Sequence, residues 1–379
     1  MSSKIVQTLR QMQRKKVVVG MSGGVDSSVA ACLLAEQGYE VIGITMKTWD
    51  YDLAGLSQSS SKETGCCSLE SINDARSVAV SRGFLHYTID FREDFGEAVI
   101  EYFKSEYLRG RTPNPCVMCN TKVKWDSLLQ RARLLGADYI ATGHYARVKC
   151  INGRYRLFKG KDANKDQSYV LWGISQEALS HTIFPLAELT KPEVRALARQ
   201  FGLKVAEKSE SYEICFIPDN DYERFLKETV PDLAEKVAGG PIVDKSGKVL
   251  GVHRGYPFYT IGQRKGLGLT TPEPVYVTKI HYESNTIVVG RSEDLLHRGL
   301  LASQVNWIAF AELTEPLRCE AKIRYKDTPE PCVVSPEPVG RVRVMFDQPK
   351  RAITPGQAVV FYSGDEVLGG GFIDEVIES

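Results

Sequence analysis

The chain has 379 residues, enough for two or three domains, and 43% of them are apolar, as in globular proteins with true cores. No stretch approaches the roughly 20 apolar residues of a membrane span, and the basic segment Met1–Lys16 lacks the apolar core of a secretory signal. The net charge of +1 excludes bulk charge as an argument for nucleic-acid binding, so RNA binding would need local basic patches.

The first half of the chain alternates segments typical of strands and of helices. The expected strands are 17–20, 39–46, 84–89 and 138–142, and the expected helices are 26–37, 68–83, 94–109 and 124–136. Segment 49–63 is rich in Ser, Gly and Asp and predicts a mobile loop. Alternating strands and helices predict an α/β fold with a parallel sheet, whose ligands lie at the carboxyl ends of the strands.

The pattern changes near residue 217. Two short helices are expected at 221–229 and 231–237, followed by a turn-rich, glycine-rich and basic stretch at 239–273. Short alternating strands then predict a small β-barrel or sandwich, at 305–310, 319–325, 340–346 and 358–362. The predicted domains are therefore a catalytic domain at 1–216, a small middle domain at 217–274 and a C-terminal β-domain at 275–379.

A glycine-rich turn at Ser22–Ser28 joins the first expected strand to the first expected helix. Gly23 and Gly24 let the main chain approach a ligand closely, and amide groups at a helix N-terminus favour an anion. The turn lacks the lysine of a P-loop and the dinucleotide fingerprint. Its Ser-Gly-Gly-x-Asp-Ser pattern resembles the pyrophosphate loop of N-type ATP pyrophosphatases, which split ATP into AMP and pyrophosphate.

Nine cysteines without a signal peptide argue against a disulfide scaffold and predict a reducing, cytoplasmic location. By default each is a small buried hydrophobe, and this interpretation suits Cys32, Cys150, Cys319 and Cys332. A metal site built on Cys116-x-x-Cys119 with Cys66-Cys67 is an alternative, but adjacent cysteines are poor ligand geometry.

Two further cysteines have neighbours that favour chemistry. Cys119 follows a proline-stiffened loop, and Asn120 or Thr121 would cap the next helix, which places the thiol at a helix N-terminus among basic residues and lowers its pKa. Cys215 stands between bulky apolar residues, and for it alone a buried role and a chemical role are about equally supported.

Together these motifs resemble the bacterial tRNA-specific 2-thiouridylases over about residues 16–371. The matching pieces are Gly20–Ser27, Met46–Trp49, Gly110–Pro115, Cys119-Asn120, Ala141–Arg147, Lys165–Ser168, Cys215–Ile217, Gly262–Gly268, Arg324-Tyr325 and Thr354–Gln357. The resemblance implies an adenine nucleotide alpha hydrolase-like α/β domain, a small middle domain and a C-terminal β-barrel.

The resemblance also implies roles for individual residues. ATP would be bound by Gly20, Met21, Ser22, Gly23, Gly24, Val25, Asp26, Ser27, Met46 and Gly143. The target base would be bordered by Asn114, Pro115 and Cys116, with Cys119 as nucleophile and resolving thiol and Cys215 as the persulfide carrier. Contacts to tRNA, or orientation of it, would come from His144, Lys165, Asp166, Gln167, Arg324, Tyr325 and Gln357.

Cys116 departs from the pattern, because some relatives carry aspartate at this position. Either that carboxylate is dispensable or another group acts on the uracil ring, and Cys116 would also compete with Cys119 for Cys215.

The implied reaction is ATP-dependent thiolation of the wobble uridine at ring position 2, through an adenylated uridine and a cysteine persulfide. ATP would be a substrate with Mg²⁺, without a prosthetic group or metal site. Expected partners are the tRNAs for Lys, Glu and Gln and a persulfide donor protein. A reductant would then reset a Cys119–Cys215 disulfide, in a monomer without membrane contact.

Two rival hypotheses remain. An amide-forming synthetase of the same superfamily would need neither RNA nor a persulfide, and it would exchange ATP and pyrophosphate without tRNA. A non-catalytic RNA-binding protein would use basic clusters such as Arg324-Tyr325-Lys326 but would not hydrolyse ATP with any tRNA.

Overall fold

The computed structural model describes residues 14–49, 68–209 and 214–378. The contacts divide the chain into two compact units. Unit 1 comprises 1–95, 121–168 and 176–216, and unit 2 comprises 96–120, 169–175 and 217–379. Most of the expected loop at 49–63 and the pair Cys66-Cys67 lie outside the described residues.

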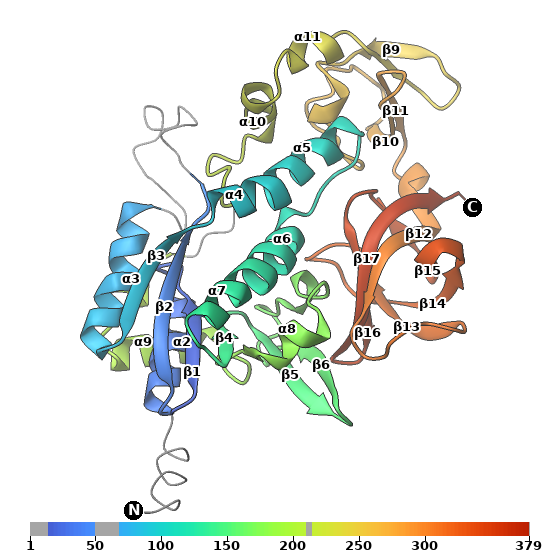
Figure 1. The fold of residues 1–379 in the computed structure, drawn as a ribbon. Helices are drawn as coiled ribbons and strands as arrows, with labels where there is room; N and C mark the ends of the chain where they lie inside the picture. The colour runs from blue at the N-terminus through green and yellow to red at the C-terminus, as the bar shows by residue number, and fades with distance from the viewer. Residues whose placement is uncertain (1–13, 50–67, 210–213, 379) are drawn as a thin grey trace, which may run out of the picture. The chain divides into compact units, whose positions relative to one another are not determined.

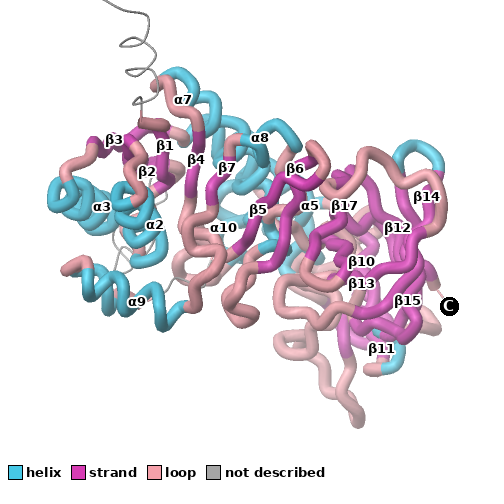
Figure 2. The backbone as a smooth tube through the Cα atoms, turned by 90° about the horizontal axis from the view of Figure 1, so that it is seen from below, coloured by secondary structure: helices cyan, strands magenta, loops and turns pink. Residues whose placement is uncertain are grey.

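Unit 1 is built on a parallel sheet with the strand order β3-β2-β1-β4-β7 (Figure 2). The strands are β1 (Lys16–Gly20), β2 (Glu40–Lys47), β3 (Leu85–Asp90), β4 (Tyr139–Ala141) and β7 (Thr182–Ile183). The chain runs outward from β1 in one direction to β2 and β3 and later in the other to β4 and β7. The loop after β1 therefore lies at the point where the strand order reverses, the usual ligand position in such sheets. The expected parallel sheet is confirmed.

Helices cover this sheet, with α2, α3 and α9 on one face and α7 on the other (Figure 2). The helices of unit 1 are α2 (Val25–Glu36), α3 (Leu69–Arg82), α4 (Arg92–Phe95), α7 (Leu128–Leu134), α8 (Gln176–Ser180) and α9 (Lys191–Gln200). Helix α2 is apolar nearly all round and packs at the centre of the core of unit 1. A hairpin of β5 (Ala146–Ile151) and β6 (Arg154–Lys159) completes the unit.

Unit 2 contains helical segments and a small mixed sheet with the order β10-β11-β8-β9. Its helices are α5 (Glu101–Leu108), α6 (Pro115–Met118), α10 (Tyr222–Thr229) and α11 (Leu233–Val237), and the strands of the small sheet are β8 (Pro241–Val243), β9 (Val249–Val252), β10 (Tyr276–His281) and β11 (Thr286–Gly290). A π-helical stretch, Gly96–Ile100, precedes α5, and another, Cys119–Ser127, follows α6 and belongs from residue 121 onward to unit 1.

The rest of unit 2 is a closed six-stranded barrel (Figure 1). The strands are β12 (Leu296–Trp307), β13 (Leu317–Lys322), β14 (Glu330–Glu337), β15 (Arg341–Arg351), β16 (Ala358–Ser363) and β17 (Glu366–Ile377). Closure comes from β12, which pairs with β15 on one side and with β17 on the other. The expected barrel is confirmed, but the strand expected at 305–310 instead runs from Leu296 to Trp307, because its partners are distant in sequence. Among the described residues, no helix is both long enough and apolar enough to cross a membrane.

Candidate active site

The glycine-rich turn lies between β1 and α2, as the sequence predicts. Gly23 has a φ of +68°, and a Cβ placed there would lie 2.2 Å from the carbonyl oxygen of Ser71. Only glycine fits, because L-residues avoid this φ and the backbone of α3 occupies the space. Gly24 is the N-cap of α2 and supplies no side-chain cap.

The turn leaves its amide groups available. Among the described residues, the N–H groups of Gly23 to Ser27 have no hydrogen-bond acceptor. They are consecutive and open a helix of twelve residues, so the helix dipole adds to their attraction for an anion. This arrangement fits the phosphates of ATP.

The serines of the turn fix its shape. The Ser28 hydroxyl donates to the carbonyl oxygen of Gly24 at 2.8 Å, and the Ser22 N–H donates to Ser27 Oγ at 3.1 Å. Ser27 and Ser28 are buried. Ser28 therefore stabilises the loop from within.

The neighbouring strands place Met46 and Gly143 at the same edge of the sheet. Gly143 follows β4, and a Cβ there would lie 2.7 Å from the amide nitrogen of Ser27. Its lack of a side chain therefore permits close contact with the start of α2. Met46 lies near the end of β2, and Met21 reaches the same strand through its N–H, which donates to the Ile44 carbonyl at 2.8 Å.

Asp26 has two partners that the sequence reasoning missed. Its carboxylate accepts from Lys191 Nζ at 2.7 and 2.8 Å and from the Tyr145 hydroxyl at 2.8 Å. Lys191 is buried at the start of α9, where Thr190 and Glu193 form a capping box. The Thr-Lys-Pro-Glu sequence was a readable helix start, but nothing in it indicates a lysine aimed at Asp26.

A second lysine supports the loop from its other side. Lys208 Nζ forms a 2.6 Å ion pair with Asp74 and donates to the carbonyl oxygen of Gly23 at 3.3 Å. Two lysines thus lie close to the turn, each paired with a carboxylate, and they hold Asp26 and the Gly23 carbonyl oxygen in place.

The segment around Cys119 differs from its expectation. The helix begins at Pro115 with Asn114 as its N-cap, so neither Asn120 nor Thr121 caps it and Cys119 does not lie at its N-terminus. Proline suits a first helical position, because its φ is preset and it has no N–H to satisfy. The first turn therefore contains Cys116.

One face of this segment is buried and the other carries the thiols. Val117 and Asn120 are buried, and Asn120 Nδ2 donates to the carbonyl oxygen of Val170 at 3.1 Å. Cys116 is exposed and Cys119 partly exposed, and their spacing of three residues brings them to one side of the segment. Both thiols therefore belong to one accessible helical face.

Gln357 fixes the loop that leads into this segment. Its Nε2 donates to the carbonyl oxygens of Thr112 and Pro113, both at 3.0 Å. The Thr112 N–H donates to the Pro355 carbonyl oxygen at 2.9 Å. These bonds orient the backbone just before Asn114. Gln357 therefore positions a protein loop, as an alternative to contacting tRNA directly.

Cys215 lies in unit 1, whereas Cys119 lies in unit 2. The next residue, Phe216, is buried, with its ring 5.7 Å from that of Phe95 and 6.3 Å from that of Trp49. Cys215 itself is partly exposed. The buried Phe216 ring thus fixes the chain next to the accessible Cys215 thiol.

His144 is buried against aromatic rings. Its Nδ1 hydrogen-bonds Thr142 Oγ1 at 2.7 Å, and its ring lies 5.6 Å from that of Trp125 and 6.4 Å from that of Phe184. Burial, together with the charge of Lys124, holds the pKa of His144 well below its usual value. The ring is therefore neutral near pH 7.

Lys165, Asp166 and Gln167 form a tightly bonded turn. The Asp166 carboxylate accepts from the N–H groups of Gly160 and Ser168, and Gln167 exchanges two hydrogen bonds of 3.0 and 3.1 Å with the backbone of Tyr145. The Lys165 N–H donates to the carbonyl oxygen of Asp162 at 3.0 Å. The turn is thus fixed beside the residue that binds Asp26.

Arg324 and Tyr325 follow β13 in the barrel of unit 2. Arg324 Nη2 donates to the carbonyl oxygen of Arg351 at 2.6 Å, and the half-exposed ring of Tyr325 lies 6.2 Å from that of buried Tyr169. Burial raises the pKa of Tyr169, which donates to the carbonyl oxygen of Ala358 at 2.8 Å. Tyr325 therefore presents an exposed aromatic face on a fixed support.

The remaining cysteines divide into two kinds. Cys32, Cys319 and Cys332 are buried, as expected, and burial raises the pKa of the Cys32 thiol to about 11. Cys150 is exposed, so its assignment to the core was wrong. It occupies an outward position on β5. Among the described residues, no group of three or more His, Cys, Asp or Glu side chains could hold a metal ion.

Comparison with known proteins relates the whole chain to one kind of enzyme. Three family descriptions match in order: tRNA methyl transferase HUP domain at 15–219, tRNA methyl transferase PRC-barrel domain at 223–291 and Aminomethyltransferase beta-barrel domain at 297–373. The tRNA-specific 2-thiouridylase MnmA of Amoebophilus asiaticus is 55% identical and covers 96% of each chain. That of Cytophaga hutchinsonii is 56% identical and covers 95% of this chain and 98% of its own.

Among solved structures, NMN synthetase from Francisella tularensis aligns with 54% of this chain and 68% of its own at 16% identity. Its TM-score of 0.32 is too low to support an argument.

Proposed function

The chain belongs to the tRNA-specific 2-thiouridylase family, a family of tRNA sulfurtransferases, and on this basis we propose that it uses ATP to replace the 2-oxygen of the wobble uridine of tRNA by sulfur. The observation that carries the proposal is the run of amides from Gly23 to Ser27 at the switch point of the sheet, which have no acceptor among the described residues. That run suits a polyphosphate, and the same chain has accessible thiols at Cys119 and Cys215.

In the proposed first step, the uridine oxygen attacks the α-phosphorus of ATP and pyrophosphate leaves. The amides of the turn would stabilise the charge that builds up on the leaving pyrophosphate. Mg²⁺ would neutralise part of the phosphate charge, and at Asp26 it would share carboxylate oxygens to which Lys191 and Tyr145 already donate. Adenylation is required because an unmodified carbonyl oxygen is a poor leaving group.

In the second step, the terminal sulfur of a Cys215 persulfide attacks ring position 2 and AMP leaves, so the uridine is joined to Cys215 through two sulfurs. The Cys119 thiolate then attacks Cys215 Sγ, which releases 2-thiouridine and forms a Cys119–Cys215 disulfide. Alternatively, Cys119 first frees sulfide from the persulfide, and sulfide attacks the ring. Both routes leave the same disulfide, which an external dithiol must reduce.

The remaining residues would position the RNA. The target base would be extruded from the anticodon loop and bordered by Asn114, Pro115 and Cys116. Contacts to tRNA are proposed for exposed Arg324 and Tyr325 and for Lys165, Asp166 and Gln167. His144 and Gln357 would act by orienting the chain, because each is bonded to neighbouring protein groups.

The finer assignments are part of the same proposal: tRNAs for Lys, Glu and Gln, a persulfide donor protein, a cytoplasmic location and a monomer. The domain boundaries at 216 and 274 also remain predictions. Cys116 would be dispensable for the first turnover, because neither balanced route above needs a third thiol.

The test is mass spectrometry of nucleosides after incubation of unmodified tRNA with the protein, ATP and a persulfide donor. We expect 2-thiouridine, AMP and pyrophosphate from the unaltered protein. Cys215→Ser and Cys119→Ser should lose thiolation while retaining ATP binding, whereas Cys150→Ser is a matched control with an exposed cysteine outside the site. Full thiolation by Cys215→Ser would refute the sulfur-carrier role. ATP–pyrophosphate exchange driven by a small amino acid without tRNA would instead indicate a synthetase.

A further inference from the structure

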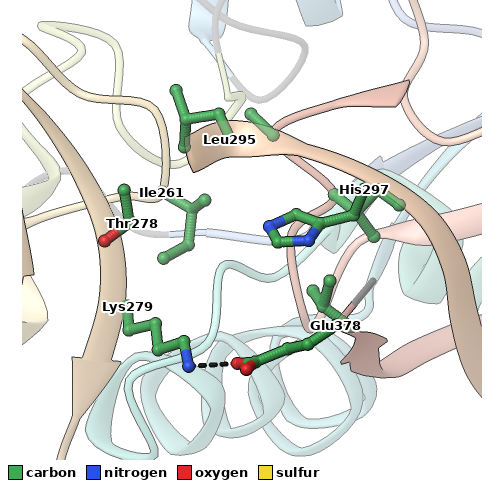
Figure 3. Close-up of a pocket in the computed structure, with 9 residues that line it drawn as sticks. Ile261, Thr278, Lys279, Leu295, His297 and Glu378 are labelled. Carbon is green, nitrogen blue, oxygen red and sulfur yellow. Dashed lines mark hydrogen bonds and ion pairs between the residues drawn. The ribbon is translucent and has the colours of Figure 1, made fainter. Parts of the chain in front are cut away.

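A basic glycine-rich loop, Thr260–Leu269, precedes β10 in the middle part of unit 2. Its start is fixed by two backbone hydrogen bonds to Val277, which Gly262 N–H donates at 2.8 Å and Gln263 carbonyl oxygen accepts at 2.9 Å. Ile261 lines a cavity of about 40 Å³ beside the ion pair of Lys279 and Glu378 (Figure 3). The start of the loop is therefore firmly attached to β10.

The interior of the loop is held by its own side chains. Gln263 Oε1 accepts from the Thr260 N–H at 3.1 Å, and Gln263 Nε2 donates to the Lys265 carbonyl oxygen at 3.0 Å. Leu267 is buried, and a Cβ on Gly251 would lie 2.6 Å from the Leu269 side chain, so Leu269 packs closely on β9. Both the start and the interior of the loop are therefore held in place.

The backbone of the loop alternates in the sign of φ. Gly266 has a φ of +75° and Gly268 a φ of +67°, whereas Lys265 and Leu267 do not have positive values. Alternating φ signs of this kind occur in nests, concavities of successive N–H groups that bind anions. In the part of the chain that the structure describes, the N–H groups of Arg264 to Leu269 have no acceptor.

Two cations stand beside these amides. Arg264 and Lys265 are exposed, and within the described ranges neither forms an ion pair. The adjoining hollow, about 290 Å³, is lined by residues between Arg264 and Val275, and none of the described residues that line it carries a carboxylate. At roughly 30 Å³ per water molecule it has room for about ten of them, and so for a phosphate group. The nearest acid in sequence, Glu273, is paired with Arg291 at 3.1 Å.

We propose that Arg264–Leu269 is a binding site for a backbone phosphate of the tRNA. The amides would bind the phosphate oxygens, and the two exposed side chains would reach along the RNA on either side. A phosphodiester is favoured over a small free anion because both cations lie at the surface, where a long ligand can engage them together. The inference rests on the proposed function, and it adds a contact that carries no base specificity.

The test measures the affinity of the full chain for an unmodified tRNA as a function of salt. Arg264→Ala/Lys265→Ala should weaken binding by about tenfold at 0.1 M salt, and it should reduce the slope of log K against log salt by about one to two. Gly268→Ala keeps both charges and meets no atom within 4 Å, but it disfavours the positive φ, so a loss of several-fold is expected. Lys248→Ala, an exposed lysine of the same small sheet region, is the matched control.

Unchanged affinity and slope in the double variant would overturn the proposal. So would loss of inorganic phosphate binding in that variant with tRNA affinity intact, since the site would then take a free anion. Thiolation by the unaltered protein is measured in parallel at saturating tRNA. Failure there refutes the proposed function, whereas normal thiolation with tRNA binding that is insensitive to the loop refutes only this inference.

Discussion

The two glycine-rich loops bind phosphate in different ways in our proposals, and the difference explains their sequences. The turn at Ser22–Ser28 relies on a helix N-terminus and is enclosed by α3, Gly143 and two lysines. The loop at Thr260–Leu269 leads into strand β10 instead of opening a helix, and it relies on alternating φ and exposed cations. A loop that must enclose a reacting phosphate needs surrounding structure. A loop that only binds the RNA phosphate backbone needs a fixed attachment to the protein and positive charge.

The sharpest test of this contrast replaces one glycine in each loop. Gly23 and Gly268 have nearly equal φ values, +68° and +67°, but only Gly23 faces backbone atoms. Gly23→Ala should cost roughly 3 kcal/mol or more and abolish AMP formation, since strain and overlap add. Gly268→Ala should cost about 1 kcal/mol. Urea unfolding and AMP release measure both, and equal costs would contradict the enclosure of the first loop.

Removing a charge from each loop should change the free energy of unfolding by amounts that differ almost as much. Asp26→Asn leaves the buried Lys191 ammonium without its carboxylate, so we expect a loss of about 3 kcal/mol in the free energy of unfolding. Arg264→Ala removes an exposed cation and should change it by less than about 0.5 kcal/mol. Chemical denaturation decides the matter, and a small effect of Asp26→Asn would show that solvent reaches Lys191.

The residues that surround the first loop should also give the stability a pH dependence that the second loop lacks. In the folded state the pKa of His144, which follows Gly143, is held below its usual value by burial. As pH falls below about 6.5, the unfolded chain takes up a proton that the folded chain does not, so stability is lost, by up to about 2 kcal/mol at pH 5. His144→Asn should lack this loss. Segment 260–269 contains no histidine and adds nothing. Parallel curves for both proteins would contradict the prediction.

The smallest expected effects come from the side-chain hydrogen bonds inside each loop. Ser28→Ala removes the bond to Gly24, and Gln263→Ala removes the two bonds that hold the second loop. Each should cost about 1 kcal/mol. Ser28→Ala should mainly raise the KM for ATP, whereas Gln263→Ala should weaken tRNA binding a few-fold. Reversed effects would mean that the ligands are assigned to the wrong loops.

Local patterns were enough to predict the sheet and the first loop. The apolar run Val17–Val19, two glycines and the apolar helix after them are contiguous in sequence, so strand, turn and helix could be recognised together. Lys191 could not be found in this way, because it lies 165 residues from Asp26 and only tertiary packing brings them together. The same reason explains the barrel strand that was misplaced at 305–310.

The segment around Cys119 was misjudged for a local reason. Asn120 and Thr121 are common caps, and that preference outweighed Pro115, which is the residue that starts the helix. Asn120 instead uses its amide in a buried bond to Val170, 50 residues away. The preference of Asn and Thr for helix N-caps is real, but the helix here begins one turn earlier, at Pro115.

The closed barrel bears on how the protein behaves at high concentration. Because β12 pairs on both sides, the six barrel strands offer one another no free edge at this seam. In the sheet of unit 1, β3 ends the strand order and carries exposed Leu85 and Tyr87. Among the described residues no strand pairs with the outer side of β3, and such an edge is a template for pairing with another chain. A lysine in place of Tyr87 is therefore the first substitution to make when the purified protein precipitates.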